Sequence, residues 1–127
     1  MSAAEATPGI RPRVRIGTPR AAPPPAGAVR GPGAGREVVF DVRNLSVSYA
    51  GKVALAGVDL EIYRNLVTAV IGPSGCGKST FLRSLNRMND SVPGIEIGGQ
   101  ILYHGHDLHG SGVDRVEVRR RIGMVFQ

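Results

Sequence analysis

The sequence has few of the residues that would cross-link it or place it in a membrane. It contains one cysteine, Cys76, so no disulfide can form within the chain, which is consistent with a reducing compartment. No run of about 18 apolar residues occurs, so we expect none of these residues to span a membrane. The apolar core of a secretory signal, about 7–15 residues long, is also missing from the N-terminal stretch.

Net positive charge is small outside the N-terminal stretch. Residues 1–36 hold six arginines against Glu5, whereas residues 37–127 hold ten basic and nine acidic side chains. The formal net charge of +6 is therefore mostly a property of residues 1–36 and gives no general argument for nucleic-acid binding by the rest. Those arginines also lack interleaved aromatic residues for base stacking, so we expect no nucleic-acid partner.

Composition divides the chain into two parts. Residues 1–36 are rich in Pro, Gly, Ala and Arg and contain few large apolar side chains. Such a stretch cannot bury enough surface to offset the entropy of ordering it, so we predict a disordered tail. Residues 37–127 have the periodic apolar patterns of a folded domain.

The folded part is predicted to mix strands and helices, which indicates an α/β fold. Apolar residues alternate with polar ones from Val38 to Val47 and from Val58 to Ile62, predicting two half-buried strands joined by a turn at Ala50-Gly51-Lys52. The run from Leu66 to Ile71 is apolar and β-branched, which is typical of a strand buried on both faces. A helix is expected after Gly77, ending near Met88 or Asn89.

Further elements are expected towards the C-terminus. They are a pair of short strands around Gly98-Gly99, a turn at His104 to Asp107, a helix from Val113 to Arg121 with Val116 and Arg120 on one face, and a short strand from Ile122 to Phe126.

One stretch carries a chemical motif. It matches the pattern G-x-x-x-x-G-K-[ST] and comprises Gly72, Pro73, Ser74, Gly75, Cys76, Gly77, Lys78, Ser79 and Thr80. Its glycines let successive backbone N–H groups turn inward around an anion, and the following helix adds partial positive charge. Lys78 is placed to reach the β- and γ-phosphates of a nucleotide, and the Ser79 hydroxyl to ligate Mg²⁺.

The context decides between this interpretation and a chance glycine-rich turn. A predicted strand precedes the loop and a predicted helix follows it, in the order that phosphate binding requires. The histidines His104, His106 and His109 match no common structural zinc spacing, so we expect them to be solvated. Cys76 is interpreted as a small residue that fits the loop, with a redox-sensitive thiol as the alternative.

Beyond these patterns, residues 37–127 resemble the nucleotide-binding subunit of ATP-binding-cassette (ABC) transporters. The resemblance is carried by Asn44 to Tyr49, Ala54-Leu55, Val58 to Leu60, the loop from Gly72 to Thr80, and Arg120 to Gln127. It implies an α/β P-loop NTPase, here the N-terminal part of an ABC ATPase domain with an antiparallel β-subdomain, truncated at the family's Q-loop.

The resemblance also implies individual roles. Tyr49 would stack on adenine, although a core residue at a strand edge is the alternative. Backbone N–H groups of residues 75–80 would hold the phosphates of ATP. Lys78 and Gln127 would serve catalysis, and Gln127 would join Ser79 as a ligand of Mg²⁺ and sense the membrane partner.

A narrower resemblance, to the ATPase subunit of bacterial phosphate importers, rests on Leu85 to Asp90, Val92-Pro93-Gly94 and the three arginines before Ile122. It implies coupling of ATP hydrolysis to uptake of inorganic phosphate at the cytoplasmic face of the cell membrane. The implied partners are membrane permease subunits and a second ATPase subunit.

The family's signature sequence, Walker B carboxylates and switch histidine all lie beyond the Q-loop. These 127 residues contain none of them, so we expect ATP binding without turnover. The alternatives are an ABC ATPase for another solute, a soluble relative acting on DNA or ribosomes, and a P-loop kinase or GTPase. Kinases and GTPases usually open with the strand of the phosphate loop, whereas here ordered residues including Tyr49 precede it.

Overall fold

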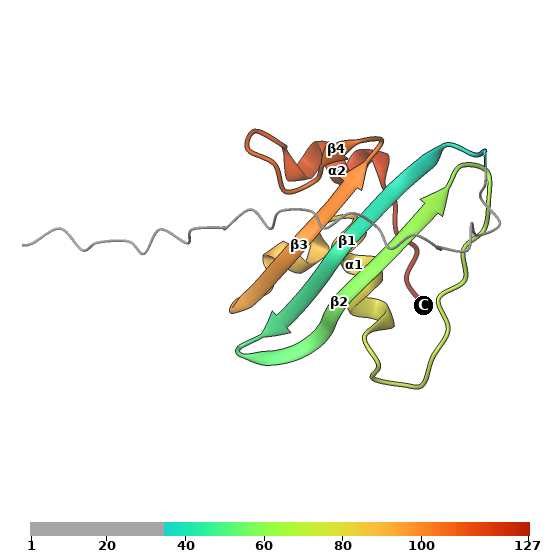
Figure 1. Ribbon diagram of the computed structural model, residues 1–127. Coiled ribbons are helices and arrows are strands. Elements are labelled where there is room, and N and C mark those ends of the chain that lie inside the picture. Colours follow the sequence, from blue (N-terminus) through green and yellow to red (C-terminus); the bar gives the residue numbers. More distant parts are fainter. Residues whose placement is uncertain (1–34) are drawn as a thin grey trace, which may run out of the picture. The chain divides into compact units, whose positions relative to one another are not determined.

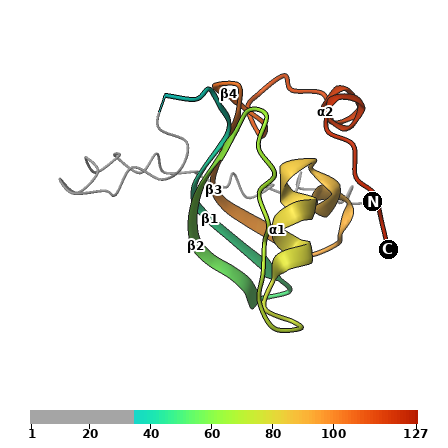
Figure 2. The ribbon, with the colours of Figure 1, turned by 90° about the vertical axis from the view of Figure 1, so that its right-hand side faces the viewer.

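The computed structural model describes residues 35–127 and shows an antiparallel sheet with a helix against one face (Figures 1 and 2). The tail predicted at residues 1–36 lies outside the described residues, apart from its last two positions. The elements are β1 (Val38–Tyr49), β2 (Lys52–Tyr63), α1 (Lys78–Leu85), the 3₁₀ helix η1 (Met88–Ser91), β3 (Ile95–Tyr103), β4 (His106–Asp107) and α2 (Arg115–Arg121).

The sheet has the order β2-β1-β3-β4, and every neighbouring pair is antiparallel. β1 is therefore bonded on both edges, to β2 through pairs such as Val42 with Leu60 and to β3 through pairs such as Val42 with Ile101. The two predicted strands on either side of Ala50-Gly51 are confirmed, and β2 begins earlier than predicted, at Lys52. The hairpin turn itself is built on left-handed backbone at Ala50, with φ of 47°.

A bulge in β1 explains why the core-packed apolar residues of this strand fall on even positions up to Val42 and on odd positions from Leu45. Asn44 has φ of 47°, and the pairing with β2 and β3 shifts register on either side of it. This bulge presses on β3, where a Cβ on Gly99 would stand 2.2 Å from the Asn44 carbonyl oxygen. Gly99 itself has φ of 84°. The strand continues through this glycine, so the predicted pair of short strands is wrong and β3 is one strand.

The core lies between the sheet and α1. Phe81 and Leu85 are buried on the inner side of this helix, which Figure 2 shows lying across one face of the sheet. The buried hydrophobic residues are Val42, Leu45, Val47, Leu55, Phe81, Leu85, Ile101, Leu108 and Val118. Together they fix α1, and with it the loop that precedes α1, against β1 and β2.

α1 ends at Leu85, earlier than the predicted end near Met88 or Asn89. The break comes from the backbone: Asn86 leaves the helical region and Arg87 adopts left-handed φ of 61°. Arg87 is held there by bonds from its guanidinium to Asp90 and to the carbonyl oxygens of Leu108 and Val113. A separate 3₁₀ turn, η1, follows.

Two predicted strands are absent from the described structure. Residues 66–71 form neither strand nor helix, and Val67 is 98% exposed. Residues 122–126 are also unpaired, and Val125 is likewise 98% exposed. Both predictions were wrong: within residues 35–127 neither run pairs with a strand of the sheet, so neither has the ladder of backbone hydrogen bonds or the packed face that a strand needs.

The C-terminal elements follow the sequence signals more closely. α2 begins at Arg115, where Asp114 Oδ1 accepts a hydrogen bond from the Val116 N–H at 2.9 Å and caps the helix. Its buried residue is Val118, whereas Val116 is 58% exposed. The turn predicted from His104 to Asp107 is a hairpin whose last two residues form β4. None of the helices in residues 35–127 has the length and apolarity needed to cross a membrane.

Candidate functional site

The predicted phosphate loop lies between β2 and α1, at the N-terminal end of the helix. Figure 2 shows the chain leaving β2, passing along the sheet and doubling back into α1. Residues 72–76 are exposed, and the helix begins at Lys78 within the motif. The loop is therefore an open segment carried on a helix whose other side is packed in the core.

The side chain of Lys78 turns back into the loop. Its Nζ donates hydrogen bonds to the carbonyl oxygens of Gly72 and Pro73, each at 2.7 Å, and lies 3.6 Å from Sγ of Cys76. The loop thus curls round one ammonium group. Because that group carries a full positive charge, hydrogen bonds from it to an anion are about twice as strong as neutral ones.

The loop presents backbone N–H groups that have no acceptor within residues 35–127. Among residues 74–80, only the N–H of Cys76 has an acceptor in the described structure, the Pro73 carbonyl at 3.4 Å. α1 starts without a side-chain cap and without an acidic residue in its first turn, so the positive end of the helix is not neutralised. Free donors at a positive helix end are the elements of a phosphate site.

Gly77 fixes the loop against the sheet. Its backbone has φ of 100°, and a Cβ there would stand 2.7 Å from both the Ala54 carbonyl oxygen and Cδ2 of Leu55. Only glycine permits this approach to β2. The start of α1 is consequently positioned by direct backbone contact with the sheet.

Tyr49 is brought next to the end of the loop. It is the last residue of β1, and its partly buried side chain packs against the core. The hydroxyl donates to Asn89 Oδ1 at 3.1 Å and lies 3.5 Å from Oγ1 of Thr80. The predicted adenine-stacking residue and the predicted phosphate loop therefore share one end of the molecule, while the stacking itself stays a prediction.

Comparison with known proteins fits this geometry. A family model described as ABC transporter matches residues 55–127, more than half of the chain. The chain belongs to the ABC transporter family. Membership places it among P-loop NTPases, agrees with an antiparallel sheet carrying two helices, and excludes the kinase and GTPase alternatives.

Individual relatives in the ABC transporter family carry a more specific name. The phosphate import ATP-binding protein PstB of Borrelia garinii is 52% identical over 91 residues, which cover 72% of this chain and 35% of that protein. PstB 1 of Streptococcus thermophilus is 50% identical over 92 residues, 72% of this chain and 34% of the relative. PstB of Thermotoga maritima is 47% identical over 91 residues, which cover 72% of this chain and 36% of that protein. The chain thus spans about a third of the length of these curated relatives.

Gln127, the residue that the ABC resemblance places in the Q-loop, makes no hydrogen bond to another predicted site residue within residues 35–127. It is exposed at the end of the unpaired segment 122–127. Within the described residues, no hydrogen bond joins it to the loop or to Tyr49. Its predicted role towards Mg²⁺ stays a prediction, as do the roles of Lys78 and Ser79.

Sequence reasoning missed the polar residues behind the loop of this ABC domain. Ser84 and Asn89 are buried, with 0% and 1% of their surface exposed, and Asn89 bonds to Tyr49. The sequence marked Asn89 as a possible helix end and as part of the phosphate-importer pattern, and predicted no contact for it. Polar side chains are usually exposed, so nothing in the pattern marked Asn89 as an interior residue.

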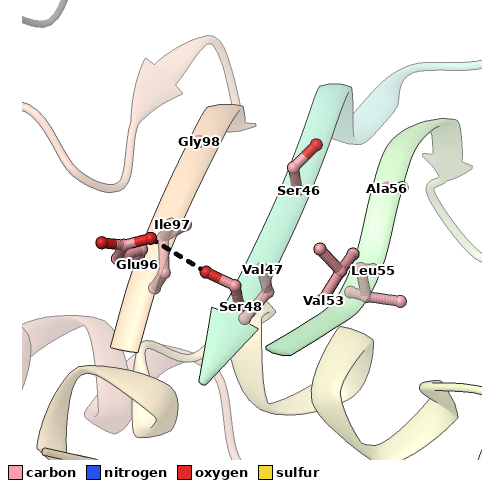
Figure 3. A pocket seen from close by; sticks show the side chains of 9 residues that line it. All are labelled: Ser46, Val47, Ser48, Val53, Leu55, Ala56, Glu96, Ile97 and Gly98. Carbon is pink, nitrogen blue, oxygen red and sulfur yellow. Dashed lines mark hydrogen bonds between the residues drawn. The ribbon is translucent and has the colours of Figure 1, made fainter. Parts of the chain in front are cut away.

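A hollow on the sheet is separate from the phosphate loop. Figure 3 shows its lining, which comes from β1, β2 and β3: Ser46, Val47, Ser48, Val53, Leu55, Ala56, Glu96, Ile97 and Gly98. The Ser48 hydroxyl donates to Glu96 Oε2 across it at 3.1 Å. Its polar pair is thus already satisfied within the protein, and no residue of the loop takes part.

The carboxyl group of Glu37, just before β1, has a lowered pKa that involves none of the predicted site residues. The Arg64 guanidinium, bonded to Glu37 at 2.7 Å, lowers the pKa of that carboxyl, and His104 at 3.1 Å contributes in the same direction. His109 lies 3.5 Å from Asp90. Two of the three histidines thus face carboxylates.

Proposed function

We propose that the chain is the ATP-binding part of the ATPase subunit of an importer for inorganic phosphate. The observation that carries this proposal is the loop closed round Lys78 at the uncapped end of α1. It occurs in a chain that is about half identical, over 72% of its length, to proteins named for phosphate import and ATP binding.

In this proposal the free N–H groups of residues 75–80 bind the α-, β- and γ-phosphates. The Lys78 ammonium exchanges the carbonyl oxygens of Gly72 and Pro73 for phosphate oxygens, which are stronger acceptors because they are charged. Tyr49 stacks on the adenine. Stacking reads no base edge, so ATP binding has little base specificity.

Mg²⁺ fits the oxygen donors on the chain. The Ser79 hydroxyl is exposed at the start of α1, and Gln127 supplies an amide oxygen. Mg²⁺ keeps several waters and binds through few protein oxygens plus those of the phosphates, so two such ligands suffice. When bound, the ion neutralises charge on the phosphates, while the loop residues hold them in place.

The partners follow from the same assignment. The proposed assembly contains membrane permease subunits, which carry the phosphate ion, and a second ATPase subunit, at the cytoplasmic face of the cell membrane. No nucleic acid takes part, because residues 37–127 are nearly neutral in charge.

A polypeptide of these 127 residues binds MgATP without turning it over. It contains neither the carboxylate that activates the attacking water in the family nor the signature sequence that closes the second half of the site. Measurable, sustained release of phosphate from ATP by the purified chain would contradict this part.

The binding site is tested by titrating ATP with Mg²⁺ into the chain in a calorimeter. Lys78→Ala removes a charge-assisted pair of hydrogen bonds and should weaken binding by about 10- to 100-fold. Arg115→Ala is the matched control, because it also removes one positive charge, from an exposed position at the start of α2. Equal losses in the two variants would mean that general charge, and not the loop, attracts the nucleotide.

The solute is tested in cells. Deleting the gene should lower uptake of labelled inorganic phosphate and leave uptake of sulfate unchanged. The reverse pattern would assign the subunit to another importer while leaving the nucleotide site intact.

A further inference from the structure

A cluster of buried polar side chains lies directly behind Tyr49. Asn89, from η1, donates through Nδ2 to the Thr80 carbonyl oxygen and to the Ser84 hydroxyl, each at 2.8 Å. The Ser84 hydroxyl in turn donates to the same Thr80 oxygen at 2.8 Å. With 1% of Asn89 exposed, these bonds are shielded from water and its amide is held rigidly.

The orientation of the Asn89 amide follows from its partners. A carbonyl oxygen can only accept, so the group facing Thr80 must be the nitrogen. Both of its hydrogens are then used, and the amide oxygen has one direction left. It points at Tyr49, whose hydroxyl donates to it at 3.1 Å.

The backbone beyond Tyr49 is tied down by the same part of the chain. Ala50, in left-handed conformation, donates its N–H to the Gly94 carbonyl oxygen at 2.8 Å, just after η1. Tyr49 is thus held at two points, its hydroxyl and the following peptide, by the segment that runs from α1 to β3. That segment also carries the end of the phosphate loop at Thr80.

We propose that Asn89 is a positioning residue, which sets the tilt of the Tyr49 ring and its distance from the phosphate loop through the Asn89 Oδ1···Tyr49 hydroxyl contact. This inference rests on the proposed function, in which Tyr49 stacks on adenine. The base and the triphosphate are held by different elements, β1 and α1, so binding both at once requires a fixed offset between them. Asn89 bonds to both elements and supplies that offset.

The test compares two probes on the full chain: ATP and inorganic tripolyphosphate, both with Mg²⁺. Tripolyphosphate binds through the loop alone, so the ratio of the ATP affinity to the tripolyphosphate affinity measures what the adenosine part of ATP contributes. Tyr49→Phe keeps the ring and removes the hydroxyl, and should lower the ATP affinity by about 3- to 10-fold, with tripolyphosphate changed less than about twofold. Asn89→Ala should lower the ratio to the same degree.

The double variant Tyr49→Phe with Asn89→Ala completes a cycle. If Asn89 acts through the tyrosine hydroxyl, its removal in the Tyr49→Phe background lowers the ratio no further. A merely structural role would weaken both probes together and would persist in that background, which would overturn the inference. If Asn89→Ala does not fold, Tyr49→Phe decides alone, and an unchanged ratio overturns the inference.

Tyr49→Leu separates this inference from the proposal beneath it. Removing the ring should lower the ATP affinity by about 5- to 100-fold relative to tripolyphosphate. If Tyr49→Leu lowers the ratio while Tyr49→Phe leaves it unchanged, stacking stands and the positioning role fails. If Tyr49→Leu has no effect on the ratio, the stacking role fails and the inference fails with it. Absence of binding by either probe would refute the nucleotide site as a whole.

Discussion

β2 and the segment 66–71 both contain many apolar side chains, but β2 is a paired strand and the segment 66–71 is irregular. In β2, Val58, Leu60 and Ile62 alternate with polar residues and pack against the core, and the strand is bonded to β1 along its length. In the segment 66–71, Val67 and Ile71 are 98% and 89% exposed. The difference lies in the neighbours: β1 supplies β2 with hydrogen-bond partners and a packed face, and nothing in residues 35–127 supplies them to the segment 66–71. A strand is a property of a pair of segments.

The largest loss of stability is expected from a substitution at the close contact between β1 and β3, where Gly99 lies against Asn44. Gly99→Val places a Cβ 2.2 Å from the Asn44 carbonyl oxygen and forces a branched residue into φ of 84°. We expect a loss of at least about 3 kcal/mol in the free energy of unfolding, from strain and overpacking together. Urea denaturation followed by circular dichroism measures it.

Gly98→Ala is the control for that variant. The nearest atom to a Cβ at Gly98 is Cβ of Ser46 at 4.0 Å, and the backbone there is not left-handed. This substitution should change stability by less than about 0.5 kcal/mol. Equal losses at the two glycines would show that the bulge at Asn44 does not press on β3.

A second comparison is between the stability costs of truncating one side chain in the sheet and one in the segment 66–71. Leu45 is fully buried in β1 and Val67 is 98% exposed. Leu45→Ala should cost about 2–5 kcal/mol through lost burial and a residual cavity, whereas Val67→Ala should stay within about 0.5 kcal/mol. Thermal melts of the two variants measure this difference. A cost at Val67 similar to that at Leu45 would mean that the segment 66–71 is packed in solution.

The smallest effect concerns the ion pair that joins the ends of β1 and β2. Arg64 lowers the pKa of Glu37, so ionised Glu37 stabilises the folded state above its unfolded pKa, and this contribution is lost as pH falls through the lowered folded value. Glu37→Gln should therefore lower the melting temperature slightly at pH 7, and by less at pH 3. Because both side chains are exposed, the shift should also shrink in high salt. An equal shift at pH 3 would assign the effect to packing.

Some features could be predicted because their signals are local. The hairpin of β1 and β2 follows from alternation around Ala50-Gly51, and the helix expected after Gly77 begins at Lys78, inside one contiguous motif. Phosphate binding by that motif stays a prediction. The N-cap of α2 at Asp114 was not predicted as such, although a helix from Val113 was. Here short-range chemistry determined short-range structure.

Other features depend on distant neighbours that a single sequence does not reveal. The run from Leu66 to Ile71 is as apolar as a buried strand, and only the missing partner decides against it. Gly98-Gly99 was interpreted as the junction of two short strands, because the bulge at Asn44 that Gly99 accommodates lies far away in sequence. Asn89 is a polar residue buried in the interior, and its burial is explained by its hydrogen bonds to Thr80 and Tyr49, which are distant in sequence.

The bonds of Lys78 to the Gly72 and Pro73 carbonyl oxygens have a thermodynamic consequence. Phosphate binding at this loop is an exchange reaction, in which the ammonium gives up two internal acceptors for external ones. The measured affinity is therefore a difference between two sets of hydrogen bonds, and the loop carries its own competing ligand. Because Lys78 already bonds to these carbonyl oxygens, the loop is curled before the nucleotide binds, and the entropy cost of ordering the loop falls on folding and not on binding. The exchange also favours highly charged phosphates, because a weakly charged anion cannot replace the carbonyl oxygens as acceptors of the ammonium.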